Sequence, residues 1–277
     1  MDLASLLPPG IDLATLLVLI AILAVSAIMS GLSGFGFSAV GALCLWMLPP
    51  KMGVPLLMSL SAANQVMSLG QLKADMKPLK EWWPDGPGPY LLGGLAGVPL
   101  GLMILSALPT STLMAVFGAF LVSYAAYSML KPASLHVEIK GGWVSSGLVG
   151  LVGGIIGGFT AFPGATVVIW SGLRQLHKSE SRAIVQPFIF VLQIVSLVLL
   201  AIKRPEIFSH TYWMLLLITV PVVLPGTFLG VRLYRSLSDI NFRRVTFMLL
   251  GLSGFSLLVK AVGVMHLFGG VAHAATH

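Results

Sequence analysis

Charged residues are scarce in this chain of 277 residues: only 9% are Asp, Glu, Lys or Arg, against about 25% in soluble globular domains. Seven long stretches contain none of them, namely 13–50, 52–72, 86–130, 141–173, 183–202, 207–231 and 245–259. A helix needs about 20 apolar residues to cross the hydrocarbon core of a membrane. The composition therefore predicts an all-α polytopic membrane protein.

The usual reactive groups are also few. Cys44 is the only cysteine, which excludes an intramolecular disulfide. No carboxylate falls inside an uncharged stretch, which argues against a proton relay or a cation pathway. All six histidines lie in predicted loops or tails, and no metal-ligand spacing or phosphate-binding lysine motif is present. We therefore expect no enzyme activity, no cofactor and no metal site.

The net charge of +7 does not indicate a nucleic-acid partner in a chain this apolar. Basic loop residues are instead expected to set the membrane topology and to contact anionic lipid. The chain begins MDLASLLPPGIDL, which lacks the basic start of a signal peptide. We interpret the first apolar run as a retained helix.

Glycine interrupts two of the apolar runs at their centre, in MSGLSGFGFSAVGA (29–42) and GGIIGGFTAFPGA (153–165). These runs predict two broken segments, 13–49 and 141–172, in which a new helix starts near Ser38 and near Ala165. Unbroken helices are predicted at 53–72, 88–108, 111–130, 183–202, 211–231 and 245–264.

The order of these segments indicates an internal duplication. Gly31, Gly34, Gly41 and Ala42 match residues 123 positions later, Gln65 matches Gln193 at an offset of 128, and Gly97 and Gly101 match Gly226 and Gly230 at 129. The predicted repeats are 1–135 and 136–277, joined by the polar linker 131–140. We expect Gly93, Gly97, Gly101, Gly226 and Gly230 to serve close helix packing.

The distribution of Lys and Arg favours a hairpin in each broken segment. If each broken segment crossed the membrane once, each side of the membrane would have eight basic residues. If each segment instead forms a hairpin that returns to the side it entered from, one side has twelve basic residues and the other has four. The positive-inside rule favours the second arrangement.

Each repeat is then a broken helical hairpin plus three helices, giving eight to ten membrane segments in two inverted repeats. Both termini are predicted on the outer side of a bacterial inner membrane. Whether the hairpin legs cross fully or re-enter stays open.

Inverted repeats with broken helices place a substrate site at the breaks. The helix starts that follow the breaks offer free N–H groups and a positive dipole end, which suit an anion without a buried cation. Hydroxyl and amide side chains are expected to add donors, and phenylalanines apolar walls. The candidate substrate-binding residues are Ser33, Gly34, Phe35, Gly36, Phe37, Ser38, Asn64, Gln65, Gly157, Gly158, Phe159, Thr160, Phe162, Gly164, Gln186 and Gln193.

Three stretches, 31–73, 147–173 and 181–197, resemble the TauE/SafE sulfite-exporter proteins, also called the 4-toluene sulfonate uptake permease superfamily. The resemblance covers essentially the whole chain and includes the turn Leu48-Pro49-Pro50. It implies a secondary transporter of sulfur-containing anions such as sulfite, sulfoacetate or arylsulfonates. The first break, SGFGFSAV, lacks the proline of many members, and two phenylalanines in each break favour an organic sulfonate.

Two other functions fit the same pattern. Two inverted broken helices also build a passive anion channel, and a membrane scaffold subunit would use the buried polar residues only for packing. The predicted partners are a small anionic substrate and membrane lipid. The exact substrate, the direction of transport, the coupling ion and the oligomeric state, with a homodimer as one candidate, are left open.

Overall fold

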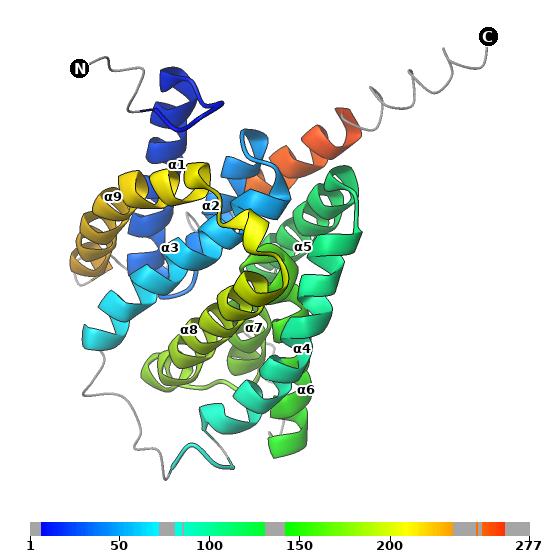
Figure 1. The fold of residues 1–277 in the computed structure, drawn as a ribbon. Coiled ribbons are helices and arrows are strands. Elements are labelled where there is room, and N and C mark those ends of the chain that lie inside the picture. The colour runs from blue at the N-terminus through cyan, green and yellow to red at the C-terminus, as the bar shows by residue number, and fades with distance from the viewer. Residues whose placement is uncertain are drawn as a thin grey trace.

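The computed structural model describes residues 7–71, 81–84, 86–130, 142–234, 248 and 251–263. Within these ranges the chain is helical and contains no strand. The elements, in chain order, are α1 (Leu13–Ser33), α2 (Phe37–Gly41), η2 (Ala42–Trp46), α3 (Pro50–Gln71), α4 (Pro87–Ala107), α5 (Thr110–Leu130), α6 (Trp143–Thr160), α7 (Gly164–Leu173), α8 (Lys178–Lys203), η4 (Pro205–Ile207) and α9 (His210–Tyr234). A further apolar helix, Gly251–Gly263, follows (Figure 1).

Six of the described helices are long and apolar enough to span a membrane: α1, α4, α5, α6, α8 and α9. The protein is therefore an all-α polytopic membrane protein, as its composition predicts. The 22 residues of α3 have sufficient length, but Asn64 and Gln65 make the helix more polar. Both side chains are at most 1% exposed, so α3 is a central helix that turns its polar residues into the bundle.

The structure confirms a break in each predicted segment. α1 ends at Ser33, Gly34 has the left-handed φ of 81°, and α2 begins at Phe37. α6 ends at Thr160, Ala161 has a left-handed φ of 58°, and α7 begins at Gly164. A left-handed residue ends a helix because its backbone cannot continue the right-handed spiral. The sequence placed both new helix starts within one residue.

The chain reverses at each break, so the two broken segments are hairpins. The hydroxyl of Thr166 in α7 donates to the carbonyl of Val149 in α6 at 3.4 Å. In the first hairpin, a Cβ added to Gly41 would lie 3.5 Å from Ser26 Oγ of α1. The second legs are the short apolar helices Phe37–Trp46 and Gly164–Leu173. At 1.5 Å per residue each covers about 15 Å, which is half of a hydrocarbon core. As straight helices, these legs are too short to cross the hydrocarbon core.

Glycines allow the closest helix pairs, which are α4 with α6 and α1 with α9. A Cβ on Gly158 would lie 2.8 Å from the Cα of Gly101, and one on Gly230 would lie 3.1 Å from the Cα of Gly31. Added atoms on Gly93, Gly97 and Gly101 would likewise collide with the backbone of α6. The packing role predicted for these glycines is confirmed.

Replacing Gly158 by alanine is expected to destabilise the protein by about 1–3 kcal/mol, because the methyl group must push α4 and α6 apart. Gly70→Ala is the matched control, since no atom lies within 4 Å of its added Cβ. Thermal unfolding of the purified variants tests the prediction. If both variants unfold at the same temperature, the close α4–α6 contact is not needed for stability.

Equivalent hydrogen bonds in the two hairpins lie 127 residues apart. Phe35 N bonds to Ser33 Oγ, and Phe162 N bonds to Thr160 Oγ1. The offset of 123 deduced from glycine matches is therefore wrong by four residues, which is about one helical turn. With the corrected value, the offset between the repeats is 127 at the breaks, 128 at the glutamines and 129 at Gly97 and Gly101. Pro163 is then equivalent to Gly36.

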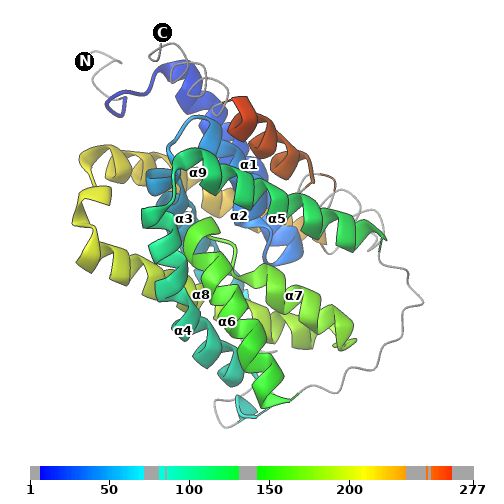
Figure 2. The same cartoon turned by 90° about the vertical axis from the view of Figure 1, so that its right-hand side faces the viewer.

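The two hairpins run in opposite directions. In Figures 1 and 2, α1 descends from the upper end of the molecule, whereas α6 ascends from the lower end. This arrangement agrees with the inverted repeats that the charge distribution predicts. The predicted repeat boundary at 135/136 and both chain termini lie outside the described residues.

Candidate functional site

The hydroxyl groups of Ser33 and Thr160 hold the two breaks in shape. Ser33 Oγ donates to the carbonyl of Met29 at 2.9 Å and accepts from Gly36 N at 3.0 Å. Thr160 Oγ1 donates to the carbonyl of Ile156 at 2.7 Å and accepts from Phe162 N at 3.1 Å. Each hydroxyl has a single hydrogen, and a carbonyl of its own helix accepts it. The structure thus uses these side chains to build the breaks and does not turn their donors toward a ligand.

A buried glutamine reaches the left-handed residue of each break. Gln65 Nε2 of α3 donates to the carbonyl of Gly34 at 3.2 Å, and Gln193 Nε2 of α8 donates to that of Ala161 at 3.3 Å. The two glutamines are 1% and 2% exposed. Carbonyls freed by a helix break need such partners inside a bilayer. The structure therefore brings both predicted glutamines to the breaks.

Several buried polar atoms around the breaks have no hydrogen-bond partner among the described residues. They are the Oε1 atoms of Gln65, Gln186 and Gln193 and the hydroxyl of Ser38. A buried polar group without a partner costs about 1–3 kcal/mol. Three of the four are amide oxygens, which only accept hydrogen bonds, so a donor such as water is needed to satisfy them.

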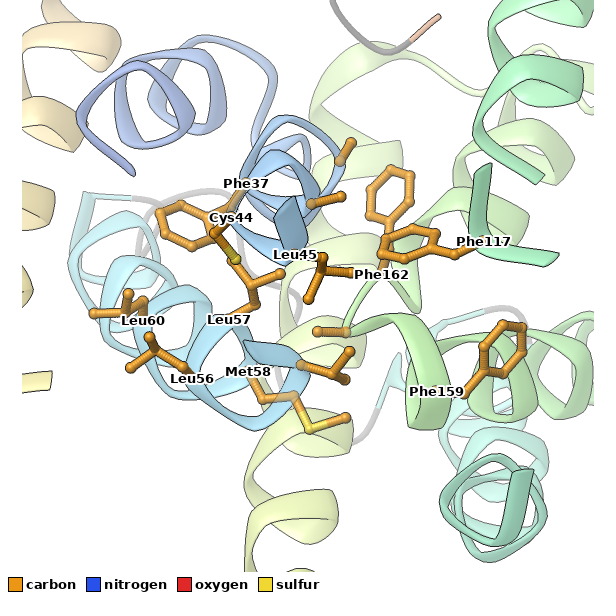
Figure 3. Packing of buried hydrophobic residues seen from close by; sticks show 14 of the residues in the cluster. Phe37, Cys44, Leu45, Leu56, Leu57, Met58, Leu60, Phe117, Phe159 and Phe162 are labelled. Carbon is orange, nitrogen blue, oxygen red and sulfur yellow. The ribbon is translucent and has the colours of Figure 1, made fainter. Parts of the chain in front are cut away.

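The two breaks meet through aromatic side chains. The rings of Phe35 and Phe162 stack with centroids 6.2 Å apart and planes at 13°. Phe120 and Tyr124 of α5 add edge-on contacts to Phe162 at 6.4 and 6.0 Å. Figure 3 shows Phe37, Phe117 and Phe162, from three different segments, directed into one apolar cluster. The site therefore combines polar backbone turns with an aromatic wall.

Arg182 is the site residue that sequence reasoning missed. Its Nη2 atom donates to the carbonyl of Leu32 at 2.7 Å, and its Nε atom would lie 3.4 Å from a Cβ added to Gly34. From the sequence we expect no cation beside the breaks, whereas a half-buried guanidinium adjoins the first break. The spacing of the polar residues in this part of the sequence could have identified Arg182. Arg182, Gln186 and Gln193 are four and seven residues apart, which places them on one face of α8.

The other predicted residues lie in packing positions. Asn64 Nδ2 donates to Ser30 Oγ at 2.6 Å, and Asn64 Oδ1 accepts from the hydroxyl of Thr227. This amide links α1, α3 and α9 one turn before the break. Phe37 and Phe159 are buried in the apolar cluster, and added Cβ atoms on Gly157, Gly158 and Gly164 would meet Pro163, Gly101 and Ile189.

Lys260 holds the far end of the first hairpin. Its Nζ atom donates to the carbonyls of Leu45 at 2.9 Å and Trp46 at 2.5 Å, and it lies 5.4 Å from the centroid of the Trp46 ring. The ammonium group therefore caps the carbonyl end of the short leg, where a positive charge is favourable.

Replacing Lys260 by methionine is expected to lower the free energy of unfolding by about 1–3 kcal/mol, because two carbonyls lose a charged donor. Val259→Ala, at a half-exposed neighbour, is the control. Thermal unfolding in detergent measures the difference. An unfolding temperature for Lys260→Met equal to that of the control would show that the cap is dispensable.

No group of three or more His, Cys, Asp or Glu side chains that could hold a metal ion occurs in the part of the chain that the structure describes. In comparisons with known proteins, the family model described as sulfite exporter TauE/SafE matches residues 18–257. No curated protein and no solved structure matches the chain. The matched range includes both breaks, the three buried glutamines and Arg182.

Proposed function

The chain belongs to the sulfite exporter TauE/SafE family, a family of membrane transporters, and from this premise we propose that it carries a sulfur-containing organic anion by alternating access. The anion is bound where the two helix breaks meet. The observation that carries the proposal is the convergence of Gln65, Gln186 and Gln193 on breaks joined by the Phe35–Phe162 stack.

The polar groups at the breaks suit an oxyanion. The nitrogen of each glutamine has two hydrogens, and the carbonyls of Gly34 and Ala161 accept only one from each of Gln65 and Gln193. A third donor, Gln186 Nε2, would lie 3.0 Å from a Cβ added to Gly34 in the first break. These donors complement the three oxygens of a sulfonate.

The aromatic residues favour an organic sulfonate over bare sulfite. Sulfite needs hydrogen-bond donors alone, whereas an arylsulfonate also buries a ring. Phe35, Phe162, Phe120 and Tyr124 supply aromatic faces and edges beside the breaks. Each aromatic pair contributes about 0.5–1.5 kcal/mol beyond the area that it buries.

Ligand-induced stabilisation tests this proposal. Sulfite, sulfoacetate, 4-toluenesulfonate and acetate are added to the purified protein, and the unfolding temperature is measured. At a hundred times its dissociation constant, a ligand that binds only the folded state adds about 2.7 kcal/mol. We expect stabilisation by a sulfonate, which is lost in Gln193→Ala but kept in Thr219→Val, a change in a buried threonine that bonds only within α9. No stabilisation by any of the four anions would contradict the proposal.

We further propose a bacterial inner membrane with both termini on the periplasmic side, as the charge distribution suggests. Cys44 is buried, so thiols introduced at the surface can be labelled over a low background. In intact cells, a membrane-impermeant maleimide should label Glu206→Cys, in the short connection after α8, but not His177→Cys, before α8. The opposite labelling pattern would invert the proposed topology.

A further inference from the structure

The two breaks have equivalent backbones but different neighbours. Gly34 and Ala161 share the left-handed conformation, and each carbonyl accepts from a glutamine. The glutamines are 128 residues apart, and the same offset relates Arg182 and Gln186 of α8 to Val54 and Met58 of α3. Val54 and Met58 are apolar and at most 1% exposed. The central helices therefore present polar side chains at one break and apolar side chains at the equivalent positions for the other.

The first break has the character of an oxyanion site. Gly34 lacks a side chain, and a Cβ added there would lie 3.0 Å from Gln186 Nε2 and 3.4 Å from Arg182 Nε. The Nη2 atom of Arg182 donates to the carbonyl of Leu32 at 2.7 Å, which holds the guanidinium beside the first break. Gln186 is 2% exposed, so its Nε2 donor lies inside the bundle beside Gly34. An arginine that faces the interior of a membrane bundle usually marks the path of a substrate or ion.

The second break has an aromatic environment. Phe162 directly follows Ala161 and contacts Phe35, Phe120 and Tyr124. Met58 belongs to the same apolar cluster, as Figure 3 shows. The ring contacts of Phe162 are with these aromatic side chains. This end of the site suits an apolar or aromatic body and not a second charged group.

We propose that the substrate site is polarised, with the sulfonate group at the first break and the apolar body at the second. Arg182 and Gln186 bind the sulfonate oxygens beside Gly34, and Phe162, Phe120 and Tyr124 contact the body. This inference rests on the proposed function and adds a single orientation of the substrate to it. A planar guanidinium offers two parallel donors to an oxyanion, which lysine cannot reproduce.

The test compares the binding of sulfite and 4-toluenesulfonate to the purified full-length protein by calorimetry. Arg182→Gln is expected to weaken both ligands by about 10- to 100-fold, the range for hydrogen bonds to a charged group. Phe162→Leu is expected to weaken 4-toluenesulfonate alone, by about 3- to 10-fold, through loss of the aromatic contact. Arg174→Gln is the matched control, because Arg174 lies at the end of α7 and donates to Tyr90 at 3.5 Å.

The results separate the two proposals. If wild-type protein binds 4-toluenesulfonate and Arg182→Gln binds it equally well, the polarised site is wrong and anion transport stands. If wild-type protein binds neither anion, the proposed function fails and this inference fails with it. Arg182→Lys covers the case in which the glutamine variant does not fold, since it keeps the charge. Sulfite binding to Arg182→Lys that equals the wild type would contradict the two-donor contact.

Discussion

Replacing Gln193 by leucine is expected to reduce sulfonate uptake at least tenfold. The substitution removes the Nε2 donor from the carbonyl of Ala161, which then stays buried without a partner. That loss costs about 1–3 kcal/mol, and the turn that carries Phe162 also loses the amide that holds it in place. Because the carbonyl belongs to the left-handed residue of the second break, both effects act on the proposed site. Uptake of labelled 4-toluenesulfonate into proteoliposomes measures the result.

A control separates loss of the site from loss of the fold. Thr219→Val also removes a buried polar group, but the hydroxyl of Thr219 bonds only to carbonyls of its own helix. It should retain most of the uptake. Gln193→Leu must still unfold cooperatively, at a temperature close to that of the control. Uptake by Gln193→Leu above half of the wild-type value would show that the amide serves packing alone, as a scaffold protein would require.

Replacing Gly34 by valine is expected to abolish uptake and to destabilise the fold by about 2–4 kcal/mol. Gly34 has a φ of 81°, and the left-handed region costs an ordinary residue about 1–2 kcal/mol, with a β-branched residue at a further disadvantage. The added Cβ would also lie 3.0 Å from Gln186 Nε2 and displace it. The substitution therefore combines backbone strain with overpacking at the break.

The second break supplies the matched control for this prediction. Ala161 already occupies the left-handed region with a φ of 58°, so Ala161→Gly relieves strain while it leaves the carbonyl that Gln193 binds. Uptake and thermal stability should remain close to wild type in Ala161→Gly. Equal uptake by Gly34→Val and Ala161→Gly would show that the conformation of the first break does not matter for transport.

The helices and the breaks could be predicted because they follow from local chemistry. Uncharged runs of membrane length gave the long helices, and glycine inside those runs gave two helix starts that the structure places at Phe37 and Gly164. Gln65 and Gln193 were found because a buried amide in an apolar helix needs a partner. That partner proved to be the carbonyl of the left-handed residue in each break.

The remaining features depend on packing and could not be predicted from the residues alone. Glycines at four-residue spacing match equally well one turn out of register, so the glycine matches predict an offset of 123 for the first segment, whereas the structure shows 127. Arg182 precedes the uncharged run 183–202 and is therefore predicted in a loop, whereas α8 begins earlier, at Lys178. The roles of Ser33 and Thr160 depend on a hydroxyl bond to the preceding helical turn, which composition does not reveal.

Counterflow in proteoliposomes tests most directly whether the protein is a carrier whose substrate site lies where the two helix breaks meet. Vesicles are loaded with unlabelled 4-toluenesulfonate, and entry of the labelled compound is followed for wild-type protein and for Gln193→Leu. The account predicts saturable entry that internal substrate accelerates, and its loss in the variant. Entry that rises linearly with concentration and ignores internal substrate would indicate a channel. Undiminished counterflow in the variant would place the substrate site elsewhere.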